Sequence, residues 1–149
     1  MGSQTGAGVQ LAISVAAPAT NDAAGYGALT FTTIGQLDKL GSFGAQAAKV
    51  EFQPLFGPKQ KFKGSFDYGA VQPTGALDDT DAGQTMLTAA ADNETNALNS
   101  YRVTYPNGAK RFFQGRCFGM PEGVDGADNM IMINPVVEIC TKIVRVAGS

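Results

Sequence analysis

Few residues of this chain of 149 amino acids could carry out chemistry. Histidine is absent, which excludes Ser-His-Asp and Cys-His catalysis, the facial iron triad and most zinc sites. The densest carboxylates are Asp78, Asp79 and Asp81, but a calcium loop needs alternating ligands, a glycine and then a glutamate at a fixed distance. Here the glycine is Gly83 and the next glutamate is Glu94, so we predict that Asp79 and Asp81 cap a helix instead.

A second acidic segment, residues 119–129, is rich in glycine and aspartate. Its carboxylates are Glu122, Asp125 and Asp128. They could hold a cation, although a solvated turn is the simpler interpretation. We find no catalytic constellation, and we expect no cofactor, no metal site and no enzymatic activity.

Composition narrows the class of protein further. Cys117 and Cys140 are too few for a disulfide scaffold; they could face each other if their strands pair, but we interpret them as reduced thiols. The net charge of −2 and the pI of about 4.9 do not favour a dedicated nucleic-acid binder. No run of 18 apolar residues predicts a membrane span, and Met1–Gln4 lacks the basic start of a secretory signal. We therefore expect a soluble protein made in the cytoplasm.

Glycine and proline total 26 residues, which favours a β-rich chain with many turns over a helical bundle. The length predicts one domain. We interpret residues 1–28, which carry one charge, as a flexible N-terminal arm with a possible short strand at 9–15. Residues 29–149 then form the folded domain.

The most informative segment is residues 48–72, which predict a long β-hairpin with its tip at 54–58. Because side chains in a strand alternate between faces, residue parity predicts one apolar and one charged face. The predicted apolar face comprises Val50, Phe52, Phe56, Phe62, Phe66 and Tyr68. The predicted charged face comprises Lys49, Glu51, Gln53, Lys59, Lys61, Lys63, Ser65 and Asp67.

The hairpin tip breaks this alternation, since Leu55 and Phe56 lie at an end that nothing nearby in sequence would cover. We therefore interpret the hairpin as a docking arm. Its lysines, Lys59, Lys61 and Lys63, could contact a nucleic-acid backbone, pair with carboxylates of a neighbouring subunit, or protect an exposed strand from aggregation. The acidic net charge favours the second and third roles over the first.

The remaining patterns predict strands and one helix. Strands are predicted at 29–37, 100–105 and 110–118, and a helix at 77–93. Residues 130–146 predict either a strand pair or one bulged strand interrupted at Asn134-Pro135. The core face of that last segment is predicted at odd positions, Ile131, Ile133, Val137, Ile139 and Ile143. The predicted fold is mainly β: two packed antiparallel sheets, as a β-sandwich or partly closed barrel, with one flanking helix and the long hairpin arm.

Several segments, in this order, resemble a phage tail tube protein, the major tail protein of long, non-contractile-tailed phages. They are Phe31–Leu37, Lys63–Gly69, Asp78–Gln84, Tyr101–Gly108 and Phe112–Gly115. Their order and spacing, over about residues 29–146, carry the resemblance. It implies a structural virion protein of the tail, assembled in the host cytoplasm and not an enzyme.

The resemblance also implies how the protein would work. Six copies would close into a ring, one sheet of each joining a continuous barrel around a lumen, and rings would stack into a tube through which DNA is ejected. Partners would be further copies of the chain, tape-measure, tail-tip and terminator proteins, and double-stranded DNA in transit, which is not bound sequence-specifically. No membrane is implied.

In this interpretation the hairpin reaches the next ring. The expected inter-ring or inter-subunit contacts are Val50, Phe52, Pro54, Leu55, Phe56, Lys59, Lys61 and Phe62. The candidates for the lumen surface are Lys49, Glu51, Lys63 and Asp67.

Two alternatives remain at the level of sequence. One is a monomeric β-barrel whose phenylalanine and tyrosine side chains line a pocket for a small ligand. The other is a different ring-forming component on the same fold, either a tail terminator or a subunit of a type VI secretion tube.

Overall fold

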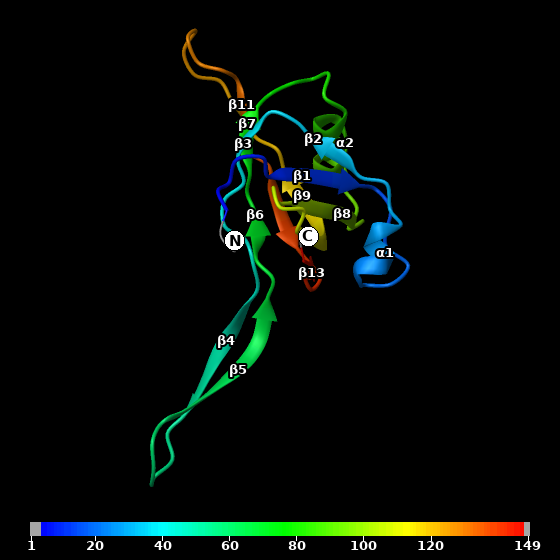
Figure 1. The fold of residues 1–149 in the computed structure, drawn as a ribbon. Helices are drawn as coiled ribbons and strands as arrows, with labels where there is room; N and C mark the ends of the chain where they lie inside the picture. The colour runs from blue at the N-terminus through cyan, green and yellow to red at the C-terminus, as the bar shows by residue number, and fades with distance from the viewer. Residues whose placement is uncertain (1–3, 148–149) are drawn as a thin grey trace.

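The computed structural model describes residues 4–147, and within them the chain is mainly β. Two helices, α1 (Ala23–Gly27) and α2 (Ala82–Asp92), interrupt the strands. The strands are β1 (Gln10–Ser14), β2 (Thr32–Ile34), β3 (Leu37–Lys39), β4 (Gln46–Phe52), β5 (Gln60–Asp67), β6 (Ala70–Val71), β7 (Thr74–Ala76), β8 (Asn99–Thr104), β9 (Lys110–Gly119), β10 (Glu122–Gly123), β11 (Met132–Ile133), β12 (Val136–Ile139) and β13 (Val144–Val146). They form three antiparallel groups: a large sheet, a small sheet and the separate β4–β5 hairpin (Figure 1).

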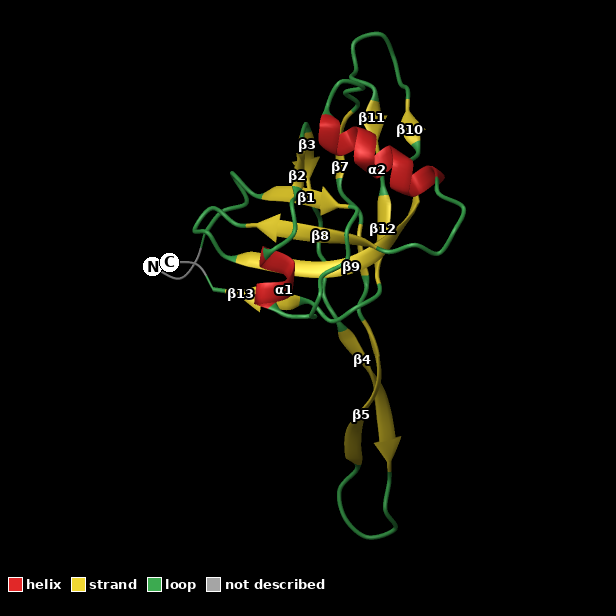
Figure 2. Ribbon diagram, turned by 90° about the vertical axis from the view of Figure 1, so that its right-hand side faces the viewer, coloured by secondary structure: helices red, strands yellow, loops and turns green. Residues whose placement is uncertain are grey.

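The large sheet has the order β2-β1-β8-β9-β12-β6, and β13 also pairs with β9 (Figure 2). Its centre is the β8–β9 hairpin, as the alternating sequence and the Pro-Asn-Gly turn predict. The turn is closed by hydrogen bonds from the Tyr105 amide to the Ala109 carbonyl (2.8 Å) and from the Gly108 amide to the Tyr105 carbonyl (2.9 Å). Gly108 has a φ of +91°, a conformation that favours glycine.

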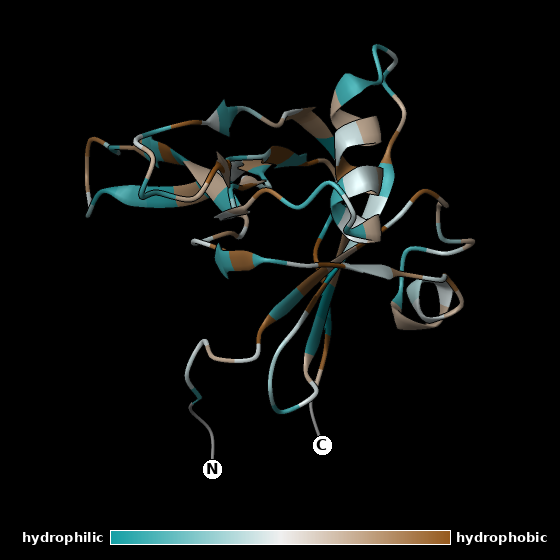
Figure 3. Cartoon of the chain, turned by 90° about the horizontal axis from the view of Figure 1, so that it is seen from above, coloured by the Kyte–Doolittle hydropathy of each residue, from teal (hydrophilic) through white to brown (hydrophobic). Residues whose placement is uncertain are grey.

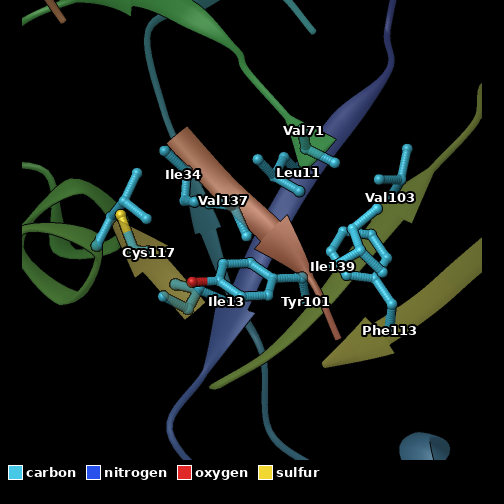
Figure 4. Close-up of a cluster of buried hydrophobic side chains, with 11 residues drawn as sticks. Leu11, Ile13, Ile34, Val71, Tyr101, Val103, Phe113, Cys117, Val137 and Ile139 are labelled. Atoms are coloured by element: carbon cyan, nitrogen blue, oxygen red, sulfur yellow. The ribbon is translucent and has the colours of Figure 1, made fainter. Parts of the chain in front are cut away.

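The core lies against one face of this sheet. Along β8, Tyr101 and Val103 point into the core and are fully buried, whereas Arg102 and Ser100, which is also buried, point to the opposite face. Figure 3 shows hydrophobic and hydrophilic residues following one another along the strands. Side chains from β1, β8, β9 and β12 meet in the cluster of Figure 4. The cluster consists of Leu11, Ile13, Ile34, Val71, Leu87, Tyr101, Val103, Phe113, Cys117, Val137 and Ile139.

The small sheet, β10-β11-β7-β3, lies at one end of the body, and α2 packs against β1, β2 and β9 (Figure 2). The arrangement is sandwich-like, and the strands do not close into a barrel. The predicted helix at 77–93 begins later than expected, because Asp78 accepts hydrogen bonds from the Thr80 amide (3.0 Å) and hydroxyl (2.7 Å) in a preceding turn.

The N-cap residue of α2 is Asp81, whose carboxylate accepts from the Gln84 amide (2.9 Å). The same carboxylate accepts from the Gly35 amide (3.0 Å), at the connection between β2 and β3. The buried Gln84 side chain donates to the carbonyls of Gly35 and Ala76, both at 2.9 Å. Asp81 and Gln84 therefore fasten the helix to both sheets, while Asp79 is exposed in the preceding loop.

The N-terminal segment differs from its sequence-based interpretation. Strand β1 pairs with β2 and β8 inside the large sheet, and its Leu11 and Ile13 are in the core. Further on, Tyr26 of α1 is fully buried and stacks on Phe112, with ring centroids 5.2 Å apart. Residues 10–28 thus belong to the folded body and are not a free arm; residues 1–3 lie outside the described part.

Two further predictions need correction. The strand expected at 29–37 is divided into β2 and β3 by Gly35 and Gln36. The chain turns at Gln36, which has a φ of +62°. The segment at 130–146 contains β11, β12 and β13, and Ile131 is 44% exposed although Ile133 is buried. One helix was expected beside the sheets, and the short α1 is a second.

Candidate assembly interface

The β4–β5 hairpin, which we call the arm, extends from the body into solvent (Figures 1 and 2). Its strands pair only with each other, so each has one edge without a backbone partner among the described residues. A two-stranded hairpin alone is marginally stable in water, and unpaired edges are open to pairing with another chain. The arm is therefore the element of this fold best placed to contact another molecule.

The tip of the arm holds its shape through internal hydrogen bonds. The Gln53 side-chain amide donates to the carbonyls of Pro54 (3.0 Å) and Gly57 (3.2 Å), and Gly57 has a φ of +122°. Leu55 and Phe56 are nevertheless fully exposed, at 110% and 97%. The structure thus places two apolar side chains at the far end of the arm, where its own body does not cover them.

The faces of the arm follow the predicted parity only in its outer half. There Val50 lies opposite Phe62, and Lys49 lies opposite Lys63. Nearer the body, the register shifts by one residue, so that Ala47 lies opposite Phe66. A β-bulge of this kind moves the following side chains to the other face.

The shift corrects two assignments. Phe66 lies on the face of Lys49 and Glu51, not on the face of Phe62. Asp67 pairs with Gln46 and lies on the opposite face, so it does not share a surface with Lys49, Glu51 and Lys63. Its carboxylate instead accepts from the Gly69 amide (2.9 Å) where the arm rejoins the body. Residue parity alone could not reveal the bulge. A glycine inside a predicted strand often marks a bulge or a close approach, so Gly64 was a signal in the sequence. In the structure, a Cβ on Gly64 would lie 3.0 Å from the Val50 side chain.

One face of the arm is strongly basic. The Glu51 carboxylate forms ion pairs with the ammonium groups of Lys49 and Lys59, each with an N–O distance of 3.0 Å. Glu51 also lies opposite Lys61 on the neighbouring strand. These lysines hold the pKa of the Glu51 carboxyl below its usual value, Lys49 having the larger effect. With Lys63 included, four lysines surround one glutamate, which gives this face a net charge of +3 in a chain whose total is −2.

The opposite face of the arm is apolar. Val50, Phe52 and Phe62 are 50%, 58% and 55% exposed. Together with Leu55 and Phe56 they form a contiguous set of exposed apolar side chains on one element, which marks an interaction site more often than a free surface. The structure therefore brings together the apolar residues that the sequence assigned to inter-subunit contacts.

No comparable site for a small ligand or a metal is found in the described residues. A hollow of about 620 Å³ between the start of β1 and β3 is an open surface groove and not an enclosed pocket. Within residues 4–147 no group of three or more carboxylates or thiols is arranged to hold a metal ion, and Glu122, Asp125 and Asp128 are not gathered into such a group. The ligand-binding barrel is not supported, because the sheets do not close.

The two cysteines are free thiols in this fold. Cys117 is buried in the core, and burial raises the pKa of its thiol. Cys140 is partly exposed and accepts a hydrogen bond from the Arg116 guanidinium at 3.3 Å. Neither described helix is long and apolar enough to cross a membrane.

A comparison with protein-family models gave no match, and a comparison with curated protein sequences gave none either. Among solved structures, the chain is similar to one in a structure described as the cryo-EM structure of the anti-feeding prophage (AFP) baseplate, 6-fold symmetrised. The TM-score is 0.64 at 5% sequence identity, and the match covers 93% of this chain and 91% of that chain. The two chains therefore share a whole fold and not a single motif.

Proposed function

We propose that this chain is a structural subunit of a phage tail or a related particle, in which six copies close into a ring and rings stack into a tube. The observation that carries the proposal is the arm, which exposes six large apolar side chains and two strand edges without a partner among the described residues. The fold shared with a chain of a six-fold symmetrised prophage baseplate supports the same class of assembly.

Physical considerations favour an assembly over a monomer. Burying each exposed phenylalanine, leucine or valine would contribute about 1.5–3 kcal/mol, and the gain would recur at every subunit. A contact between an arm on one subunit and a different surface on the next is head-to-tail, and such contacts form rings or open stacks. The edge strands β2 and β6 of the large sheet offer further backbone groups through which neighbours within a ring could pair.

The finer role we propose is a conduit for DNA. A lumen of acidic character would let duplex DNA slide, whereas a lumen lined by lysines would hold it. Asp67 lies on the other face and does not offset the charge of +3 around Glu51. We therefore assign the lysine face, which includes Lys49, Glu51 and Lys63, to contacts between subunits and not to the lumen.

In this role the partners are other copies of the chain, together with the tape-measure, tail-tip and terminator proteins of the same particle. DNA passes through without sequence-specific binding, and the particle is assembled in the host cytoplasm. The protein has no catalytic part in this process.

A second candidate is a ring subunit that does not form long tubes. It is favoured by the similar chain, which belongs to a structure described as a baseplate. The tail terminator considered from the sequence is another ring of this kind, whereas a type VI secretion tube subunit would polymerise.

Light scattering of the purified protein over a range of concentrations distinguishes these possibilities. A tube subunit is expected to give a mass that keeps growing with concentration, and a ring subunit a mass that stops at six chains. A mass of one chain of 15.5 kDa at every concentration and salt would contradict both.

A further inference from the structure

The charges of this chain are segregated along its long axis. Four of its seven lysines lie on the arm at one end. At the other end lie β3, the β7–α2 loop and the β10–β11 loop (Figures 1 and 2). The carboxylates of these elements and of the adjoining β10 are Asp38, Asp78, Asp79, Asp81, Glu122, Asp125 and Asp128, and their single basic residue is Lys39.

The β10–β11 loop, residues 124–131, is the most prominent part of the acidic end. Every residue in it is exposed, and it contains Asp125 and Asp128 but no lysine or arginine. It also exposes three apolar side chains, Val124 (72%), Met130 (67%) and Ile131 (44%). The outer half of the arm carries four lysines and one glutamate beside its exposed apolar side chains. The loop likewise combines an excess of one sign of charge with apolar side chains that nothing within the described body covers.

The base of this loop is fixed by the body. The Leu77 amide donates to the Ile131 carbonyl (2.8 Å), and the Asn134 amide donates to the Pro121 carbonyl (3.0 Å). Within the loop, the Asn129 amide donates to the Gly126 carbonyl (3.1 Å). The loop is thus a defined surface rather than a loose connection, and its shape is available to a partner.

We propose that the β10–β11 loop of one copy receives the outer arm of the next copy. Leu55 and Phe56 pack against Val124, Met130 and Ile131, and the two lysines that follow the tip, Lys59 and Lys61, face Asp125 and Asp128. This inference rests on the proposed function, since it names the partner of the arm in the stacked assembly.

The occupant is a second copy for two reasons. The arm and the loop lie at opposite ends of the molecule, so a chain cannot bring its own tip to its own loop (Figure 1). The two surfaces have opposite charge, and each exposes apolar side chains, so they complement each other in sign and in character. Because the two surfaces differ, the contact is heterologous and repeats along one axis, as a stack of rings requires.

Reciprocal charge reversal in the full chain tests this contact. One variant carries Lys59→Glu and Lys61→Glu, a second carries Asp125→Lys and Asp128→Lys, and a third combines all four substitutions. Sedimentation velocity at low and moderate salt measures self-association of each. We expect each two-site variant to weaken self-association by about tenfold or more, and the combined variant to recover most of the loss.

A matched control reverses two exposed carboxylates elsewhere, with Asp92→Lys at the last residue of α2 and Glu94→Lys just after it, and is expected to assemble as the original chain does. If the original chain assembles but the reversals have no effect, or the combined variant is no better than either half, this docking site is wrong while the proposed function stands. If the original chain never self-associates, the proposed function fails and this inference fails with it.

Discussion

Val50 lies directly opposite Phe62 across the arm, yet both side chains remain about half exposed, at 50% and 55%. A cross-strand apolar pair normally stabilises a hairpin by covering one face. Here the two side chains cover each other only in part, and no other element of the described body packs on this face of the arm. The apolar face of the arm is therefore left partly uncovered by the described residues of its own chain.

The first prediction concerns the tip. Replacing Leu55→Asp and Phe56→Asp leaves the body folded, because neither side chain touches the core, but it prevents stacking. Each lost burial is worth about 1.5–3 kcal/mol per subunit contact. Circular dichroism checks the fold, and electron microscopy checks the length of the assemblies.

The control for the tip is the pair Leu55→Met and Phe56→Leu, which keeps both positions apolar and is expected to preserve assembly. Long tubes from the aspartate variant would mean that the tip does not act as a docking element.

The second prediction concerns the helix cap. Asp81→Ala removes the acceptor for the amides of both Gln84 and Gly35, so we expect the free energy of unfolding to fall by about 1–2 kcal/mol. Asp79→Ala is the matched control, and its effect should be within about 0.5 kcal/mol, since that carboxylate is exposed. Urea denaturation of both variants measures the difference; equal effects would contradict the assignment of the cap.

The third prediction concerns the packing of α2 on β2. A Cβ on Gly83 would lie 2.3 Å from the Thr33 carbonyl oxygen and 2.6 Å from the Ile34 Cα, both of them backbone atoms. We therefore expect Gly83→Ala to destabilise the fold by about 1–3 kcal/mol through overpacking, although alanine normally favours a helix.

Gly27→Ala in α1 is the control for this substitution, because a Cβ there meets no atom within 4 Å. Thermal unfolding compares the two variants, and a Gly83→Ala protein as stable as the original would show that α2 and β2 are not in such close contact.

The fourth prediction is a pH dependence. Burial in the core raises the pKa of the Tyr101 phenol above its ordinary value of 10.0. The unfolded chain therefore loses this proton at a lower pH than the folded chain. The stability contributed by the protonated phenol is complete below pH of about 10 and decreases as the pH rises above it.

Tyr101→Phe removes this titration, so its free energy of unfolding should fall less between neutral pH and pH of about 11. At neutral pH the change should cost little, because the Tyr101 hydroxyl has no hydrogen-bond partner among the described residues. Urea denaturation at both pH values measures how far the free energy of unfolding of each protein changes with pH. An equal change in the original chain and in Tyr101→Phe would contradict the buried position of the phenol.

Features encoded locally could be predicted from the sequence. The β8–β9 hairpin lies almost where alternation and the Pro-Asn-Gly turn predict it, since both signals act over a few residues. The arm was also predicted, because its apolar and charged residues alternate around a tip rich in proline and glycine. Asp81, one of the two predicted caps, is the N-cap residue of α2.

Features that depend on distant parts of the chain could not be predicted. Leu11 and Ile13 lie among glycine, alanine and serine residues typical of a linker, and only pairing with β8 makes them part of the core. The bulge that moves Phe66 and Asp67 to new faces depends on the register of β4 with β5, which residue parity does not report. The segregation of charge between the arm and the β10–β11 loop can be recognised only when the positions of both elements in space are known.

The most direct test of the account is negative-stain electron microscopy of the purified full chain, with class averages of the particles viewed end-on. We predict rings or stacked tubes with a central hole and six-fold symmetry. Particles no larger than a single chain, at every protein and salt concentration examined, would contradict the claim that this protein is built to assemble through its arm.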